Sequence, residues 1–297
     1  MKIAIQDLSK IYPNGHKALS HVNLEIERGM FGLLGPNGAG KSSLMRILVT
    51  LQEYSSGNIK INGLDINKKR KQIRKLIGYL PQDFTFFSKL KTWEFLDYAA
   101  QLSGKTRRKE RRLAVEEMLE QVGLFNVRNR LANKLSGGMK RRLGIAQTLI
   151  GDPEVIVIDE PTTGLDPEER IRFRNILSNL SQKDVAIILS THIVGDISST
   201  CSNMALLHKG EVVFKGAPEE LIQQAKGHVW QLQVTDQEFN ELKDQYPIVS
   251  TIPSVGQWEI QLLADKLEGM DAVNIAPNLE HAYVYFMQNK LNVSLNT

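Results

Sequence analysis

The sequence predicts an α/β fold: a core with a mixed sheet, a helical insert within that core, and a small α+β appendage at the C-terminus. Short apolar runs alternate with helix-like segments through much of the chain, which is typical of strands joined by crossover helices. The region 84–151 is mainly helix-like and interrupts this alternation. From about residue 227 the pattern changes again. We therefore expect two domains, 1–226 and 227–297, with a hinge at Lys226 and Gly227.

Periodicity predicts the N-terminal elements. Apolar and polar residues alternate over 3–5 and over 22–26, as they do in strands with one exposed face. Met30–Leu34 has the character of a buried strand, and Lys41–Leu51 that of the helix after it. The chain therefore begins with strands that lead into a strand-to-helix connection.

The helical insert and the second half of the core follow in order. Over 115–122 apolar residues recur at i, i+3, i+4 and i+7, and Gly123 is a suitable helix stop. The alternation of strand and helix resumes with a strand at Val155–Ile158, a helix at Pro167–Ser181 and a strand at Val185–Ser190. These elements predict that the insert is a helical subdomain inside one α/β core.

The tail has a different pattern. A hairpin-like segment at 205–215 and a helix at 218–224 close the core. Residues 230–234 and 258–262 then alternate as strands do, and apolar residues recur at helical spacing over 279–286. No cluster in this region indicates a chemistry, so we expect its aromatic residues to lie in its core.

Composition places the chain among ordinary globular proteins. Its 297 residues are 42% hydrophobic and 24% charged, enough for one large domain with a small one. The longest apolar runs, such as Val185–Leu189, are much shorter than the roughly 20 residues that cross a bilayer. The N-terminus lacks a long apolar signal core. A single cysteine, Cys201, excludes an internal disulfide and fits a reducing cytoplasm.

Two basic clusters, 68–74 and 105–112, have two interpretations. They could line a nucleic-acid groove, or they could be solvated helix faces near anionic lipid. We favour the second interpretation because a net charge of +4 is a mild excess for this length.

A glycine-rich loop predicts a phosphate site. The segment 35–42 reads GPNGAGKS and satisfies the pattern G-x-x-x-x-G-K-[ST] between a predicted strand and helix. Glycines let consecutive backbone N–H groups surround a phosphate chain, and the helix N-terminus adds its dipole. Lys41 is expected to reach the β- and γ-phosphates and Ser42 to bind Mg²⁺. The alternative is a glycine-rich turn with an incidental lysine. The residues expected to bind nucleotide here are Gly35, Pro36, Asn37, Gly38, Ala39, Gly40, Lys41, Ser42 and Ser43.

Two further segments strengthen this hypothesis. Asp159 and Glu160 follow an apolar strand, at the end where open α/β sheets bind ligands. Asp159 suits Mg²⁺, and Glu160 is placed to polarise an attacking water as a general base. Ser136 is a natural N-cap, and Gly137 and Gly138 leave the amides of its helix bare. This helix end is a second candidate for binding an anion, although a plain N-cap is the alternative.

Together with Gln82 in GYLPQD, Asp166 in GLDP and His192 in STH, these segments resemble the ATP-binding cassette of ABC transporters. The order also matches: glycine loop, Gln loop, LSGG signature, Asp-Glu at a strand end, Asp loop and His. The resemblance covers about residues 2–224 and implies a P-loop NTPase fold with ATPase activity. Met139 replaces the glutamine that most often follows LSGG, which leaves the helix-end amides in place.

The resemblance implies a head-to-tail dimer, either a homodimer or a heterodimer with a second cassette. Each ATP would lie between the glycine loop of one subunit and the LSGG segment of the other, where Ser136 and Gly138 would contact its γ-phosphate. His192 would contact the same phosphate, and Gln82 would bind Mg²⁺ and signal to a membrane partner. A surface histidine and a solvated loop glutamine are the alternatives.

For Tyr12 and Asp166, the resemblance implies a role in the nucleotide site, and local structure offers an alternative. Tyr12 resembles the aromatic residue that stacks on adenine, although it could simply pack against the turn at Pro13 and Asn14. Asp166 would lie at the dimer seam, although capping the helix that begins at Pro167 explains it nearly as well.

The resemblance predicts a function: a peripheral ATPase subunit on the cytoplasmic face of the membrane, working with a separate transmembrane permease. The LSGGMKRR segment and the tail resemble exporters of the drug, antibiotic-resistance and polysaccharide type. The aromatic segment 83–98 could dock the permease or pack locally, and its candidates are Phe84, Phe86, Phe87 and Trp93. A sensor role of the tail is a further possibility.

The main alternative is a soluble ABC-type ATPase that acts on nucleic acid or ribosomes. Chromosome-type members carry long coiled coils inside the cassette, and the insert here is too short to hold one. Translation-type members carry two cassettes in one chain, and this sequence has one. We therefore expect no specific nucleic-acid partner.

Overall fold

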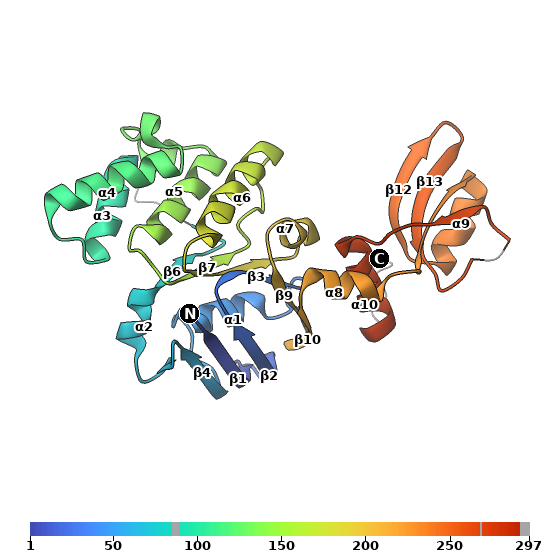
Figure 1. The fold of residues 1–297 in the computed structure, drawn as a ribbon, viewed down its shortest axis with the longest axis horizontal. Helices are drawn as coiled ribbons and strands as arrows, with labels where there is room; N and C mark the ends of the chain where they lie inside the picture. Colours follow the sequence, from blue (N-terminus) through green and yellow to red (C-terminus); the bar gives the residue numbers. More distant parts are fainter. Residues whose placement is uncertain (85–88, 268, 292–297) are drawn as a thin grey trace. The chain divides into compact units, whose positions relative to one another are not determined.

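The computed structural model describes residues 1–84, 89–267 and 269–291 (Figure 1). Its contacts divide the chain into two compact units. The first unit comprises residues 1–193 and 200–215, and the second comprises 194–199 and 216–297. The boundary at Gly216 precedes the predicted hinge because α8 (Pro218–Gln224) makes its contacts with the last helix of the second unit. The division predicted at 226 stays a prediction.

The first unit is built on a six-stranded sheet with the order β10-β9-β3-β8-β7-β6. The pairs β3–β9, β3–β8, β8–β7 and β7–β6 are all parallel. Every residue of β7 and β8 is buried, as expected for parallel strands covered on both faces. The carboxyl ends of these strands therefore meet at one edge. The strands are β3 (Gly29–Leu34), β6 (Ile77–Leu80), β7 (Val155–Asp159), β8 (Ala186–Thr191), β9 (Asn203–His208) and β10 (Glu211–Gly216).

A second, antiparallel sheet lies in the same unit, with the order β2-β1-β4-β5. Its strands are β1 (Ile3–Ile11), β2 (Lys17–Ile26), β4 (Ser56–Ile61) and β5 (Leu64–Asp65). The alternation predicted in β1 and β2 is confirmed, since their apolar residues belong to one buried cluster with α1 and with β3, β7 and β8. This shared core fixes the position of α1 between the two sheets.

The helix α1 (Lys41–Leu48) is shorter than the sequence predicts. It ends at Leu48 rather than Leu51 because Val49 leaves the helical region and Thr50 takes a positive φ of 61°. The guanidinium of Arg74, in α2 (Arg70–Leu76), then bonds the Thr50 hydroxyl and carbonyl at 2.6 and 3.1 Å. The end of the helix is therefore set by a tertiary contact.

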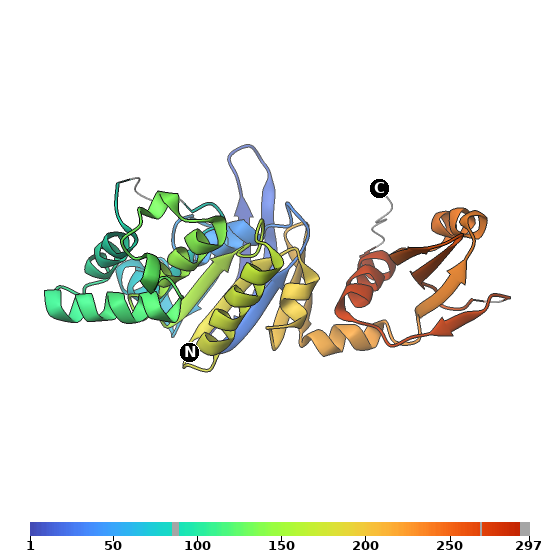
Figure 2. The same cartoon turned by 90° about the horizontal axis from the view of Figure 1, so that it is seen from above.

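The predicted helical insert is present. It contains α3 (Thr92–Leu102), α4 (Arg108–Gln121) and α5 (Gly137–Leu149), with short 3₁₀ turns at Phe125–Val127 and Ala132–Lys134; α6 (Pro167–Ser181) follows β7. Figures 1 and 2 show the green helices of the insert gathered away from the blue antiparallel sheet. Most residues of α5 are buried, including charged ones.

The predicted aromatic dock is only partly described. Phe84 meets Phe95 edge to face, with ring centroids 6.1 Å apart, which favours local packing for this residue. Trp93 is 38% exposed. Phe86 and Phe87 lie outside the described residues.

The second unit carries an antiparallel sheet with the order β12-β13-β11-β14. Leu232, Val234, Leu242, Ile260 and Leu262 form its apolar core. The predicted α+β pattern with an extra C-terminal sheet is therefore confirmed. Its elements are α7 (Val194–Ser198), α8, β11 (Val229–Val234), α9 (Asp236–Gln245), β12 (Ile248–Ser254), β13 (Gln257–Leu263), β14 (Ala272–Asn274) and α10 (Leu279–Leu291).

In the part of the chain that the structure describes, no helix combines the length and the apolar character that crossing a bilayer requires.

Candidate active site

The glycine loop connects β3 to α1, as the sequence predicts. Two of its glycines are required by close approach of other backbone: a Cβ at Gly35 would lie 2.3 Å from the Leu207 carbonyl oxygen, and one at Gly40 would lie 2.4 Å from the Ala18 carbonyl oxygen. Gly40 is also the N-cap of α1, with a φ of 106° that favours glycine. The loop is thus pressed against its neighbours, and the N-terminus of α1 opens into the site.

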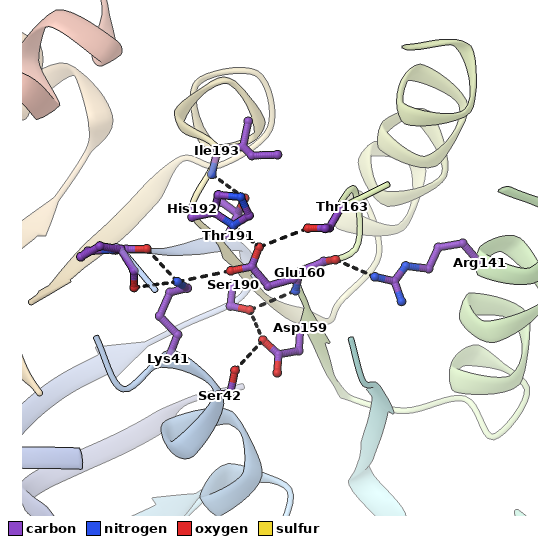
Figure 3. A network of polar contacts seen from close by, with 12 residues as sticks. Lys41, Ser42, Arg141, Asp159, Glu160, Thr163, Ser190, Thr191, His192 and Ile193 are labelled. Atoms are coloured by element: carbon purple, nitrogen blue, oxygen red, sulfur yellow. Dashed lines mark hydrogen bonds and ion pairs between the residues drawn. The ribbon is translucent and has the colours of Figure 1, made fainter. Parts of the chain in front are cut away.

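Lys41 is the first residue of α1, and its side chain is only 5% exposed. Its ammonium donates to the carbonyl oxygens of Gly35 at 2.7 Å and Pro36 at 3.2 Å, and lies 3.3 Å from Glu160 Oε1 (Figure 3). These partners offset the free-energy cost of removing the ammonium from water. The lysine is therefore held in the curve of the glycine loop.

Asp159 ends β7 and is 2% exposed. The Ser42 hydroxyl lies 3.4 Å from Asp159 Oδ1, and the Ser190 hydroxyl donates to the same oxygen at 2.5 Å. A hydroxyl beside a carboxylate suits Mg²⁺, which binds proteins through one or two such oxygens and takes the rest from phosphates and water. No cluster of three His, Cys, Asp or Glu side chains that could hold a metal by themselves occurs among the described residues. The donor set therefore fits magnesium delivered with a nucleotide.

Glu160 follows β7 with a φ of 48°, in the left-handed region. For a residue with a side chain, this conformation costs about 1–2 kcal/mol. Its N–H donates to the carbonyl oxygen of Ser190 at 3.1 Å and to the Ser190 hydroxyl at 3.2 Å, which holds the backbone in place. The strained backbone turns the carboxylate toward Lys41 and His192 rather than continuing the strand (Figure 3).

The Glu160 carboxylate has a second set of partners. His192 Nδ1 lies 2.6 Å from Glu160 Oε2, and the Thr163 hydroxyl donates to the same oxygen at 3.4 Å. His192 comes just after β8 and its side chain is 39% exposed. A buried carboxylate that faces both an imidazole and an ammonium is well placed for proton transfer.

Arg141, in α5, is a site residue that the sequence analysis missed. It is 9% exposed, and burial lowers its pKa, although the nearby carboxylates of Asp159, Asp83 and Glu160 oppose this shift. Its guanidinium donates to the Glu160 carbonyl oxygen at 2.6 Å and to the Pro161 carbonyl oxygen at 2.7 Å. The available signal was helical spacing, because position 141 lies four residues before Ile145 on a buried face.

The same guanidinium reaches the Gln82 loop. Arg141 Nη1 donates to the carbonyl oxygens of Pro81 at 3.1 Å and of Gln82 at 2.9 Å. One side chain therefore contacts the backbone of two predicted motifs.

The glycine loop, Glu160 and His192 line one cavity of about 570 Å³, a size typical of small-molecule sites, whereas Asp159 and Arg141 do not line it. It brings together the predicted Tyr12, Gln82, Glu160 and His192 with most of the glycine loop. Its lining residues are Tyr12, His16, Ala18, Asn37, Gly38, Ala39, Gly40, Lys41, Ser42, Ser43, Gln82, Glu160, Thr163 and His192. His16 and Thr163 were not predicted.

Tyr12 packs within the adjacent turn, which was the predicted alternative, while its stacking on adenine stays a prediction. It lines the cavity, but its ring also stacks on His16 with centroids 6.1 Å apart, within the adjacent turn. Its hydroxyl lies 3.1 Å from the Ser43 hydroxyl, and this hydrogen bond lowers the pKa of Tyr12. The ring is thereby anchored to α1.

The cavity of this chain does not include Ser136, Gly137, Gly138 or Asp166. Ser136 accepts a hydrogen bond from the Met139 N–H at 3.2 Å and caps α5, while Asp166 accepts one from the Glu169 N–H at 2.8 Å and caps α6. Both capping alternatives are therefore realised. The nucleotide contacts predicted for these four residues require another subunit and stay predictions.

Comparison with known proteins places this geometry in context. Residues 19–163 match the family model described as "ABC transporter". The chain is 38% identical over 251 residues to the uncharacterized ABC transporter ATP-binding protein YxlF of Bacillus subtilis, covering 84% of this chain and 82% of YxlF. It is 33% identical to the bacitracin transport ATP-binding protein BcrA of Bacillus licheniformis, covering 79% and 76%. It is 35% identical to the methionine import ATP-binding protein MetN of Helicobacter pylori, covering 76% and 71%.

Solved structures give the same picture. CbiO1 of Clostridium perfringens, part of the transporter complex cbiONQ, superimposes with a TM-score of 0.69 at 29% identity, covering 75% of this chain and 90% of CbiO1. The dimeric structure of the bacterial ABC transporter cassette MJ0796 superimposes with a TM-score of 0.66 at 27% identity, covering 72% and 98%. Among the similar proteins, the name of MetN states import, whereas the name of BcrA states transport without a direction.

Proposed function

Because the chain belongs to the family of ABC transporter ATP-binding proteins, which hydrolyse ATP to energise transport, we propose that it is the ATPase subunit of an exporter. In this proposal, two cassettes close around two MgATP and drive a separate permease. The observation that supports it most is the convergence of Lys41, Ser42, Glu160 and His192 on one cavity at the carboxyl ends of β3, β7 and β8, with Asp159 next to Ser42.

ATP would be bound mainly through the glycine loop. Its backbone and the N-terminus of α1 supply N–H donors and a positive dipole end to the phosphates. The Lys41 ammonium adds a positive charge, and its present contact with Glu160 shows that it can reach an anion there. Tyr12 would hold the adenine at the edge of the cavity, beside His16.

Hydrolysis requires a base, and Glu160 is proposed for it. Its carboxylate would accept a proton from the attacking water. His192 would orient this carboxylate and contact the γ-phosphate. Ser42, Asp159 and Gln82 would hold Mg²⁺, which supplies charge stabilisation to the phosphates when bound.

Dimerisation would complete the site. The capped N-terminus of α5 presents the backbone of Gly137, which has open space around it, together with Ser136. These groups, with Gly138 and Asp166, would contact the ATP held by the other subunit. The dimer solved for the similar cassette MJ0796 supports this arrangement. Whether the second cassette is a copy of this chain is left open in the proposal.

The membrane partner is proposed from two features. Gln82 lines the cavity and is followed directly by the segment 83–98, which is the proposed permease contact. As the resemblance to the family implies, the subunit would bind peripherally at the cytoplasmic face. Export is favoured by similarity to BcrA, whose name states bacitracin transport, and by the tail.

The substitution Glu160→Gln tests the proposed chemistry. It keeps the side-chain shape but removes the base, so turnover should fall by about 10²-fold or more while ATP still binds. Glu154→Gln is the matched control, because Glu154 is an exposed carboxylate just before the other end of the same strand. ATP hydrolysis and nucleotide binding would be measured on the purified chain. Unchanged turnover in Glu160→Gln would remove Glu160 from the role of base.

A further inference from the structure

We propose that Arg141 is a positioning residue that couples the Gln82 loop and the signature helix α5 to the backbone of Glu160. In this proposal, moving either the loop or the helix re-aims the Glu160 carboxylate. The inference rests on the proposed function, in which Glu160 is the base and Gln82 faces the permease.

The geometry of the guanidinium supports a rigid link. Its N–H groups lie in one plane, and they bond carbonyl oxygens on two separate segments: Pro81 and Gln82 on one, Glu160 and Pro161 on the other. Because every acceptor belongs to the main chain, the contact fixes backbone position. Figure 3 shows Arg141 approaching Glu160 from α5, on the side away from Lys41.

The conformation of Glu160 makes this link important for chemistry. Its positive φ persists only where the surroundings hold it. Ser190 holds the N–H of Glu160 from β8, and Arg141 holds its carbonyl oxygen from α5. The two anchors lie on either side of the Cα atom from which the carboxylate projects. Loss of the Arg141 anchor would let the peptide after Glu160 rotate and shift the carboxylate from His192.

The next residue provides a matched control. Arg142 is also buried, at 5% exposed, and also lies in α5. It pairs with Glu169 at 3.1 Å and donates to the carbonyl oxygens of Val122 and Gly123 at 2.9 and 3.0 Å. These contacts hold α5 to α6 and to the end of α4 without involving the Gln82 loop or Glu160. A purely structural role would make the two arginines equivalent.

The kinetic test compares Arg141→Gln with Arg142→Gln in the purified full-length chain. Arg141→Gln should lower kcat by about tenfold or more and leave the KM for ATP within about twofold, because the glycine loop is untouched. Arg142→Gln should keep kcat within about threefold at an equal or larger loss of Tm. If the two variants lose kcat to the same extent for the same loss of Tm, Arg141 has only a structural role and the inference is overturned.

A double mutant shows whether Arg141 acts through Glu160. Adding Arg141→Gln to Glu160→Gln should reduce the residual turnover by less than about twofold, because the carboxylate that it positions is already absent. Full additivity would contradict the proposal. If Glu160→Gln alone kept its turnover, the proposed function would fail, whereas full kcat in Arg141→Gln would overturn only this inference.

Hydrogen–deuterium exchange adds a structural readout. Exchange should rise together in residues 81–83 and 160–163 of Arg141→Gln, and it should not rise there in Arg142→Gln. Arg141→Lys keeps the charge but loses the planar fork, so it provides a milder variant with an intermediate kcat if Arg141→Gln folds poorly. Unchanged exchange in both segments of a correctly folded Arg141 variant would contradict the proposed coupling between the Gln82 loop and Glu160.

Discussion

In the first unit, buried charged side chains lie at the start of α1 and at the end of β7, where Lys41 pairs with Glu160 and Asp159 accepts a hydrogen bond from Ser190. In the second unit, the buried cluster is formed by apolar residues such as Leu232, Ile260 and Leu262. The two units therefore differ in the kind of side chain that they bury. Both units have an apolar core, but the first also buries charged groups beside its cavity.

Besides Asp196, the described part of the second unit has a polar exception in its interior, His281. His281 is 3% exposed; it accepts a hydrogen bond from the Asn278 N–H at Nδ1 and lies 2.9 Å from Gln261 Oε1 through Nε2. This arrangement needs a neutral imidazole with its proton on Nε2. The exception thus serves to hold the start of α10 to the sheet, and no catalytic partner is required to explain it.

The largest effect is expected from Lys41→Met. The change removes the charge that faces the phosphates and leaves Glu160 without its ammonium partner, so ATP affinity should fall by about 10²-fold or more and turnover should be lost. The control is Lys60→Met on the exposed side of β4, which should bind ATP normally. Nucleotide titration by calorimetry measures both. Normal ATP affinity in Lys41→Met would contradict this contrast between the two units, because the buried charge of the first unit would then have no role in binding.

A smaller effect, confined to stability, is expected in the second unit. Ile260→Ala empties part of a fully buried site and should cost about 2–5 kcal/mol of unfolding free energy, whereas Ile252→Ala, at a position 56% exposed, should cost under about 1 kcal/mol. Neither variant should change kcat at temperatures where the second unit stays folded. Urea unfolding and ATPase assays on the same samples check this. A fall in kcat at full folding would show that the second unit contributes to catalysis.

The smallest expected effect is a pH dependence of the second unit. Burial lowers the pKa of His281, and the neighbouring Glu280 only partly opposes this. The unfolded chain therefore binds the proton more readily, so stability is complete above about pH 6.5, the ordinary histidine pKa, and falls as the pH drops below it. His281→Asn should be less stable near neutrality but less sensitive to acid. Unfolding curves of the wild type and of His281→Asn at several pH values test this. Equal acid sensitivity in the two proteins would show that it arises from another group.

The sequence predicted those parts of the fold and the site that depend on local spacing. The glycine loop, the strand that ends in Asp159 and Glu160, and the caps Ser136 and Asp166 are all written in a few consecutive residues. Of the antiparallel strands of the second unit, β11 and β13 were also predicted, because period-two alternation survives without tertiary context, whereas β12 and β14 were not.

The remaining features depend on distant parts of the chain. Ser190 meets Asp159 because β7 and β8 pair in parallel register, which no local pattern states. Arg141 looks like one more surface cation beside Lys140 until packing buries its face of α5. The end of α1 and the assignment of α8 to the second unit likewise follow from contacts that form only in the folded chain.

The most direct test of the account is the oligomeric state of Glu160→Gln at saturating MgATP. Light scattering coupled to size-exclusion chromatography would measure the mass of the purified chain with and without nucleotide. The account predicts a dimer of this chain, or with a second cassette present a mixed dimer, that forms with MgATP and is lost when Ser136 is changed to Arg at the tip of α5. A strictly monomeric protein under these conditions, with no cassette partner that pairs with it, would contradict the proposal that two cassettes share each ATP.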